Sequence, residues 1–105
     1  MANITNTALQ NTETSLAVGG VTPKNLLKVS FFNTDAFNTY TVTVYSYASG
    51  GSGSDSTTVD EFALPPRTSF TIPKDQLVRL GNGDVFSAKA GTSNKVVATI
   101  NFEDR

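Results

Sequence analysis

The residues best suited to chemistry are Gly81-Asn82-Gly83-Asp84, within LVRLGNGDVFSA. Alternating glycines beside an acid occur in loops that cradle a phosphate or help to hold a metal. A dinucleotide loop needs G-x-G-x-x-G between a strand and a helix, and a P-loop needs G-x-x-x-x-G-K-[ST]; the segment matches neither pattern. Asn-Gly between alternating apolar runs is a hairpin signal, because both residues tolerate positive φ. We therefore predict a hairpin turn here, with no ligand.

Carboxylates and hydroxyls supply the other catalytic candidates. Asp60 and Glu61 are adjacent, but neighbours on a strand point to opposite faces, so they cannot flank a glycosidic bond together. We expect a solvated strand charge, or a partner for Arg67 across the next turn. Asp84 lacks the companion oxygen ligands of a calcium loop. With no His, no Cys and no G-x-S-x-G, a serine would need lysine as its base, and such a pair stays open.

We therefore expect no catalytic residue, no metal ligand, no cofactor and no enzymatic activity. The remaining candidates are Tyr45 and Tyr47 in NTYTVTVYSYA. Both lie on the face opposite Tyr40, Val42 and Val44, because side chains alternate along a strand. Two tyrosines on an outer face either stack on a sugar ring or become buried in a subunit interface, and the interface is the commoner case.

The elements that must position these residues are strands. Thr, Val, Phe, Ser, Asn and Gly dominate, and period-two patterns are separated by turn signals such as NTDAFN, LPPR and GTSN. We expect Leu27, Val29 and Phe31 to face the core, as do three further phenylalanines, Phe70, Phe86 and Phe102. The predicted strands are 14–18, 25–32, 38–48, 58–64, 67–72, 76–80, 83–90 and 95–102.

About eight short strands at this spacing predict an all-β fold. We expect a single-domain antiparallel β-sandwich over residues 1–105, of jelly-roll or immunoglobulin-like type. Residues 1–13 are expected to form an extended N-terminal arm or an edge strand, with Ile4 and Leu9 as its only anchors. The Gly/Ser-rich segment 49–57 is expected to be a long, mobile hairpin loop.

Charge and hydropathy narrow the class of partner. Eight Lys and Arg against nine Asp and Glu give a net charge of −1, with no basic run for nucleic acid. No apolar stretch is long enough to span a bilayer, and MANITNTALQ lacks the features of a signal peptide. We therefore expect no nucleic acid and no membrane partner, and assembly in the cytoplasm of the producing cell.

The order of strands and loops resembles small β-sandwich structural proteins of tailed bacteriophage virions, namely capsid decoration or cement proteins and neck or tail accessory proteins. The first half fits through TETSLAV and NLLKVSFFNTDAFNTYTVTVY. In the second half a TVTVYSY strand, a variable loop, an apolar strand ending in proline, RTSFTIPKDQLVRL and an L-x-x-GD-x-hydrophobic turn precede a last strand. These pieces are 41–47, 59–65, 69–80, 81–86 and 96–102.

The resemblance implies a non-enzymatic virion structural protein, most simply a capsid decoration or cement subunit that binds and stabilises the major capsid shell. The alternatives are a neck, tail or fibre accessory subunit and a carbohydrate-binding β-sandwich module. The expected partners are the major capsid protein or another virion protein, together with further copies of the chain in a homo-oligomer such as a trimer. The residues predicted to contact partners are Ile4, Leu9, Tyr45, Tyr47, Phe102 and Arg105.

Overall fold

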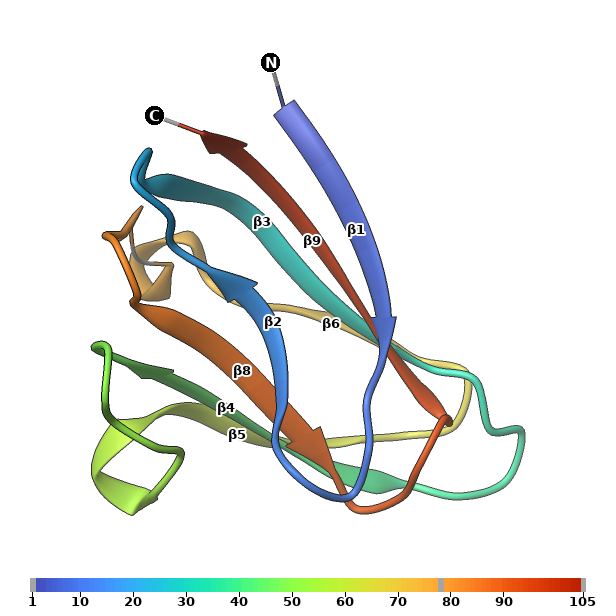
Figure 1. Ribbon diagram of the computed structural model, residues 1–105. Coiled ribbons are helices and arrows are strands. Elements are labelled where there is room, and N and C mark those ends of the chain that lie inside the picture. Colours follow the sequence, from blue (N-terminus) through green and yellow to red (C-terminus); the bar gives the residue numbers. More distant parts are fainter. Residues whose placement is uncertain (1, 78, 105) are drawn as a thin grey trace.

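The computed structural model describes residues 2–77 and 79–104 and shows two antiparallel sheets packed face to face (Figure 1). The five-stranded sheet has the order β1-β9-β3-β6, and β7 also pairs with β3; the four-stranded sheet has the order β2-β8-β4-β5. The all-β sandwich predicted from the alternating pattern is confirmed, with nine strands in the described residues. The strands of the larger sheet are β1 (Ala2–Ala8), β3 (Lys24–Asn33), β6 (Ser69–Thr71), β7 (Arg79–Leu80) and β9 (Val96–Asp104).

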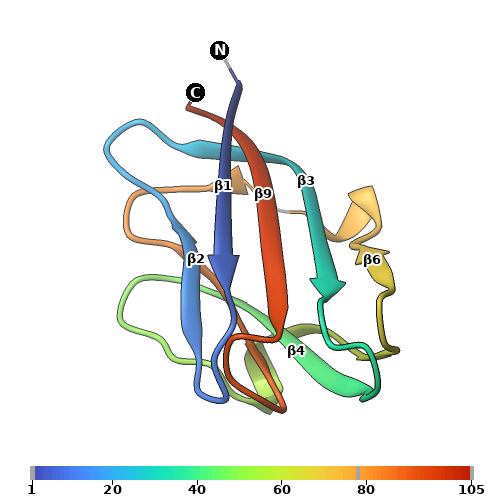
Figure 2. The same ribbon diagram turned by 90° about the vertical axis from the view of Figure 1, so that its right-hand side faces the viewer.

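The smaller sheet consists of β2 (Thr14–Val18), β4 (Tyr40–Tyr47), β5 (Thr58–Leu64) and β8 (Val85–Ala90). Two short 3-10 helices, η1 (Asp55–Thr57) and η2 (Lys74–Gln76), lie in the connections before β5 and after β6. The additional strand is β1, which occupies the segment expected to be an arm or an edge strand. It pairs along its whole length with β9, as Figure 2 also shows.

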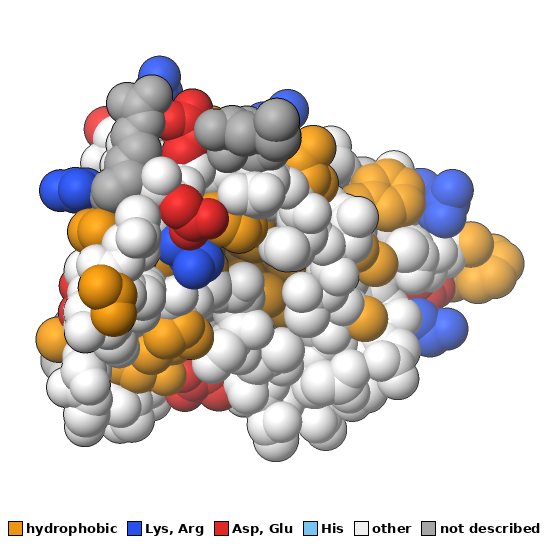
Figure 3. Space-filling view, turned by 45° about the horizontal axis from the view of Figure 1, so that its top comes forward, with side chains coloured by type: hydrophobic (Ala, Val, Ile, Leu, Met, Phe, Trp, Pro, Cys, Tyr) orange, Lys and Arg blue, Asp and Glu red, His pale blue; other side chains and the backbone are white. Residues whose placement is uncertain are grey.

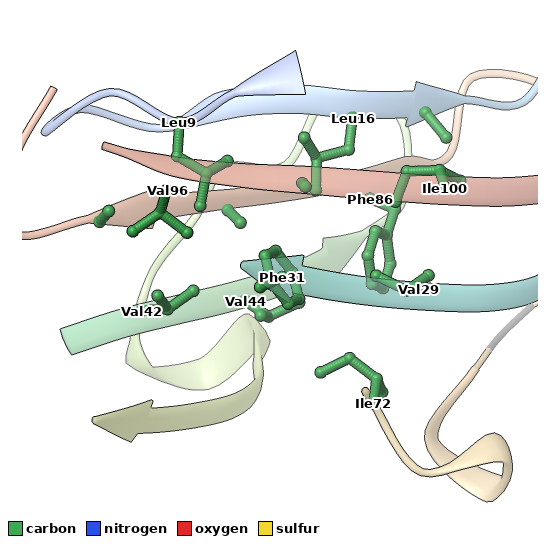
Figure 4. Close-up of a cluster of buried hydrophobic side chains, with 14 of the residues drawn as sticks. Leu9, Leu16, Val29, Phe31, Val42, Val44, Ile72, Phe86, Val96 and Ile100 are labelled. Atoms are coloured by element: carbon green, nitrogen blue, oxygen red, sulfur yellow. The ribbon is translucent and has the colours of Figure 1, made fainter. Parts of the chain in front are cut away.

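The core lies between the sheets and is built from the predicted alternating positions (Figure 4). Phe31 and Phe86 are almost wholly buried, while Phe70 and Phe102 are partly buried and pack against the cluster. Leu9 follows β1 and has no exposed surface, so it joins the end of β1 to the core. The other labelled side chains of Figure 4 come from both sheets: Leu16, Val29, Val42, Val44, Ile72, Val96 and Ile100.

One core position differs from the prediction. The pairing of β3 with β9 shifts register between Leu26 and Lys28, which is a β-bulge. The bulge places Leu26 in the core at 7% exposure and leaves Leu27 half-buried. The period-two pattern predicted Leu27 as the inward residue, and that prediction is wrong because a bulge inserts one residue into the alternation.

The glycine-rich segment 81–84 is a turn, as predicted, but it does not form a hairpin. The Asp84 N–H donates to the Gly81 carbonyl oxygen (3.0 Å), and Gly83 takes φ +85°. The strands on either side, β7 and β8, belong to different sheets, so the turn carries the chain across the sandwich. The Asp84 carboxylate accepts the Gly81 N–H (2.9 Å) and so stabilises the turn itself.

Candidate interaction surfaces

The sequence-predicted interface residues are placed in different surroundings. Ile4 lies on β1 and is 66% exposed, whereas Leu9 is wholly buried in the core and is not available to a partner. Phe102 is half-buried against the core, with the Lys24 ammonium 5.4 Å from its ring centroid. Arg105 lies outside the described residues. Ile4 is therefore the predicted contact that the structure leaves most open.

The two tyrosines differ from the predicted exposed pair. They lie on the outer face of the four-stranded sheet, as expected from the alternation, but Tyr45 is only 6% exposed. The reason is the Gly/Ser-rich segment, which folds back onto this face, so that a Cβ added to Gly53 would come within 3.0 Å of the Tyr45 ring. The predicted exposure of Tyr45 to a partner is therefore wrong. Segment 49–57 does connect the antiparallel pair β4 and β5, as the prediction of a hairpin loop requires.

Glu13 holds the segment 49–57 in place. Its carboxylate accepts hydrogen bonds from the Gly53 N–H (3.0 Å), the Ser87 hydroxyl (2.7 Å) and the Tyr47 hydroxyl. Burial raises the pKa of Glu13, but the hydrogen bonds from Tyr47, Ser87 and Gly53 outweigh it and leave this pKa below its ordinary value. The hydrogen bond between the Tyr47 hydroxyl and the Glu13 carboxylate also raises the pKa of Tyr47. This cluster anchors the loop, and its Ser87 is completely buried.

Asp60 and Glu61, the acidic pair on β5, both accept hydrogen bonds from groups of the smaller sheet. Glu61 accepts the Thr43 hydroxyl (2.8 Å) on the outer face, and the Asp60 carboxylate accepts the Glu61 N–H (2.9 Å). Among the described residues, Arg67 forms no ion pair with Asp60 or Glu61, so the predicted partnership with one of these acids is wrong. Its guanidinium donates to the Thr34 carbonyl oxygen (3.3 Å) and lies 5.1 Å from the centre of the Phe32 ring.

Sequence reasoning missed the most exposed hydrophobic side chains of the described residues. Val21, in the β2–β3 connection, is 92% exposed, and Phe37, in the β3–β4 loop, is 88% exposed. Because β3 joins the two loops, they lie at opposite ends of the sandwich (Figure 1). Figure 3 shows hydrophobic side chains with Lys or Arg neighbours at the end that carries the β3–β4 loop. The only sequence signal was an aromatic residue inside a polar turn, NTDAFN.

The loop that carries Phe37 is tightly hydrogen-bonded. Asp35 accepts the Phe37 N–H (2.8 Å), the Asn38 N–H (3.2 Å), the Asn38 side-chain amide (3.1 Å) and the Tyr40 hydroxyl (2.6 Å). Asn33, with no exposed surface, donates to the carbonyl oxygens of Asn38 (2.8 Å) and Leu64 (3.0 Å) and accepts the Asp35 N–H (2.9 Å). The aromatic ring of Phe37 therefore lies on a loop whose shape is held by hydrogen bonds within the chain.

Two surface hollows complete the description. One, of about 290 Å³, lies on the outer face of the four-stranded sheet and is lined by polar side chains together with Ala90 and Gly91, with no aromatic ring. A second, of about 210 Å³, lies beside Ile4 on the larger sheet, where Asn101 Oδ1 is buried without a hydrogen-bond partner. In the described residues no group of three or more acidic, His or Cys side chains could hold a metal, and no helix is long and apolar enough to cross a membrane.

Comparisons with known proteins add one informative likeness. No protein-family model matches the chain, and no curated protein matches it. A solved chain from the disulfide-linked pili that form Bacillus endospore appendages superposes with a TM-score of 0.50 at 11% identity, over 100% of this chain and 87% of the other. A chain of the T13 particle of the icosahedral virus IBDV matches at a TM-score of 0.26 and 13% identity, over 98% of this chain and 35% of the other. The first likeness is one of fold.

Proposed function

We propose that this chain is a structural subunit whose work is to bind other proteins in a large assembly. More specifically, we propose a capsid decoration or cement subunit that docks on the major capsid shell of a tailed phage. The alternative site in a virion is the neck, tail or fibre. The glycan-binding alternative needed two exposed tyrosines, and the burial of Tyr45 removes that basis.

The observation that carries the proposal is the presentation of Phe37. Isolated exposed hydrophobic residues are common on protein surfaces, but an 88% exposed ring on a loop fixed by Asp35 and Asn33 is a preformed anchor. A preordered anchor costs less conformational entropy on binding than a flexible one. The fold likeness to a pilus chain adds support, since that chain too belongs to a polymeric assembly.

The chemistry of the assembly differs from that of the pilus in one respect. The pili of the neighbour are disulfide-linked, whereas this chain contains no cysteine. Contacts between this chain and its partners therefore involve no disulfide. Many weak contacts repeated over a shell can still stabilise it, at roughly 25 cal/mol per Å² of buried apolar surface.

The test is binding of the purified chain to phage particles from which it has been removed. We expect Phe37→Ala to weaken binding to capsids at least tenfold, by the typical cost of losing an interface anchor, about 1.4 kcal/mol or more. Val21→Ala removes an equally exposed side chain at the other end and is the matched control. Binding to tails instead of capsids would select the alternative, and failure to bind any particle would overturn the proposal.

A further inference from the structure

The edge strands of the two sheets differ in how well they are protected against pairing with a strand of another molecule. An unpaired edge strand offers backbone groups to any other strand, and proteins blunt such edges with charges, bulges, prolines or short strands. β5 carries Asp60 and Glu61, and the Asp60 carboxylate covers the Glu61 N–H. β2 has a bulge between Ser15 and Ala17. The other border of the larger sheet has only the three-residue β6 and the two-residue β7.

β1 has none of these protections. Its seven residues, ANITNTA, contain no charge and no proline, and its pairing with β9 runs without a register shift. No described strand pairs with its other edge (Figure 1). Asn3, Ile4, Thr5 and Asn6 are all exposed, so both faces of the strand are open as well. Among the described edge strands, β1 is therefore the long one whose outer backbone groups are open to pairing with another strand.

The hydrogen-bond pattern shows which backbone groups are available. The Leu9 N–H donates to the Val96 carbonyl oxygen (2.7 Å), one step beyond the last β1–β9 pair, Ala8 with Val97. In an antiparallel ladder, alternate residues bond to the same neighbour. Thr7 and Thr5 therefore bond to β9 as Leu9 does. The N–H and C=O groups of Ile4, Asn6 and Ala8 point away from β9, toward the free edge.

We infer that β1 pairs antiparallel with β1 of a second copy of this chain, so that the larger sheet continues across a two-fold axis. This deepens the proposed function, and rests on it, by naming the contact between copies. A register centred on Thr5 pairs all seven residues: Ile4 lies opposite Asn6 of the other copy, and Thr5 opposite its own counterpart. Every pair that exchanges hydrogen bonds then uses groups at the free edges.

A second copy fits this edge better than a different strand does. Two uncharged β1 strands bring no like charges opposite each other, a combination that destabilises strand pairs. In this register the two Ile4 side chains are diagonal neighbours on the outer face, where each is now 66% exposed. The Thr5 pair on the other face is a favourable cross-strand combination. Pairing with β5 would instead meet Asp60, whose side chain already occupies its edge.

The test compares Asn6→Pro with Asn6→Ala in analytical ultracentrifugation. Proline lacks the outward N–H and is tolerated where an edge strand faces solvent, so Asn6→Pro leaves the pairing with β9 intact. It removes a hydrogen bond from each copy, and we expect the dimer dissociation constant to rise at least about 30-fold. Asn6→Ala loses the same side-chain contact to Thr99 but keeps the N–H, so it should remain a dimer.

Two outcomes would overturn the inference: a wild-type chain that stays monomeric at high protein concentration, or an Asn6→Pro variant that dimerises like the wild type. Hydrogen exchange of the unmodified chain gives a readout that needs no variant. The amides of Ile4 and Asn6 should become protected as concentration rises, and their exposure at all concentrations would contradict the pairing. A dimer that binds no phage particle would overturn the proposed function alone, and a monomer that binds capsids would overturn this inference alone.

Discussion

Asp35 shows how one side chain prepares a surface. Its carboxylate accepts bonds from two backbone N–H groups and two side chains, and so sets the path of the loop that exposes Phe37. The hydrogen bond from Tyr40 first, and then those from Phe37 and Asn38, hold the pKa of Asp35 well below its ordinary value. The hydrogen bond between Tyr40 and Asp35 also raises the pKa of Tyr40. The ionised carboxylate is therefore the form that supports the loop.

The hydrogen bonds to the Asp35 carboxylate predict that the free energy of unfolding depends on pH. The pKa of Asp35 is lower in the folded chain than in the unfolded one, so the unfolded chain binds more protons in acid. The stabilisation is complete above the unfolded pKa of about 4 and is lost progressively as pH falls below it. We expect Asp35→Asn to make the free energy of unfolding fall less steeply between about pH 5 and pH 2, as measured by urea denaturation.

The control for this prediction is Tyr40→Phe, which removes the largest cause of the shift. It should raise the pKa of Asp35, observable by NMR titration of the carboxyl carbon, and reduce the acid slope in the wild-type background. In the Asp35→Asn background the same substitution should leave the slope unchanged. Equal acid slopes in the wild type and Asp35→Asn would show that this carboxylate does not stabilise the fold.

At the scale of elements, the join between β2 and the 81–84 turn depends on a close backbone approach. The Gly19 N–H donates to the Asp84 carbonyl oxygen (2.9 Å), and the Gly83 N–H donates to the Gly19 carbonyl oxygen (2.8 Å). A Cβ on Gly19 would lie 1.9 Å from the Gly81 carbonyl oxygen. Only glycine fits at this position without moving the backbone of the turn.

We therefore expect Gly19→Ala to lower the free energy of unfolding by about 2–3 kcal/mol, the usual cost of overpacking against a rigid neighbour. Gly20→Ala is the matched control, because its Cβ would meet nothing closer than the Thr22 carbonyl oxygen at 3.8 Å. The control should stay within about 0.5 kcal/mol of the wild type. Urea denaturation of both variants measures the difference, and similar values for the two would contradict the close approach.

The elements also show what a sequence can predict. β2 and β5 have the predicted bounds, because turn-forming residues mark where each strand ends: Gly19 and Gly20 follow β2, and Pro65 and Pro66 follow β5. Asn-Gly predicted the turn at 81–84 correctly, but turn chemistry is local and does not show whether the strands on either side pair with each other. For residues 1–13 the sequence predicts only an arm or an edge strand, because a strand that buries little apolar surface shows little alternation of apolar and polar residues.

At the scale of the whole molecule, the candidate surface was the least predictable feature. The fold of segment 49–57 over Tyr45 depends on Glu13, which lies 40 residues before Gly53 in the chain. No local pattern links the two. The exposure of Phe37 likewise depends on Asn33 reaching the Leu64 carbonyl oxygen, a contact between strands of different sheets. Composition predicted a protein without metal or thiol chemistry, but only tertiary contacts determine which polar loops are fixed and which aromatics are covered.

The two proposed contacts together predict how the assembly is stabilised. β1 and β3 are both antiparallel to β9 and so run in the same direction, and β3 leads to the Phe37 loop. Antiparallel pairing of two β1 strands then places the two Phe37 loops at opposite ends of the dimer. If the chain binds a shell as proposed, such a dimer would reach two neighbouring shell subunits, and each attachment would raise the effective concentration of the other.

We therefore expect Asn6→Pro to weaken apparent binding to intact capsids by at least about 100-fold, through loss of this second attachment. Its affinity for an isolated shell subunit, measured by calorimetry per Phe37 loop, should equal that of the wild type. Phe37→Ala should reverse the pattern: it remains a dimer but binds the isolated subunit weakly. If Asn6→Pro bound capsids as tightly as the wild type, each chain would act alone on the shell, and the bridging arrangement would be excluded even if the dimer formed in solution.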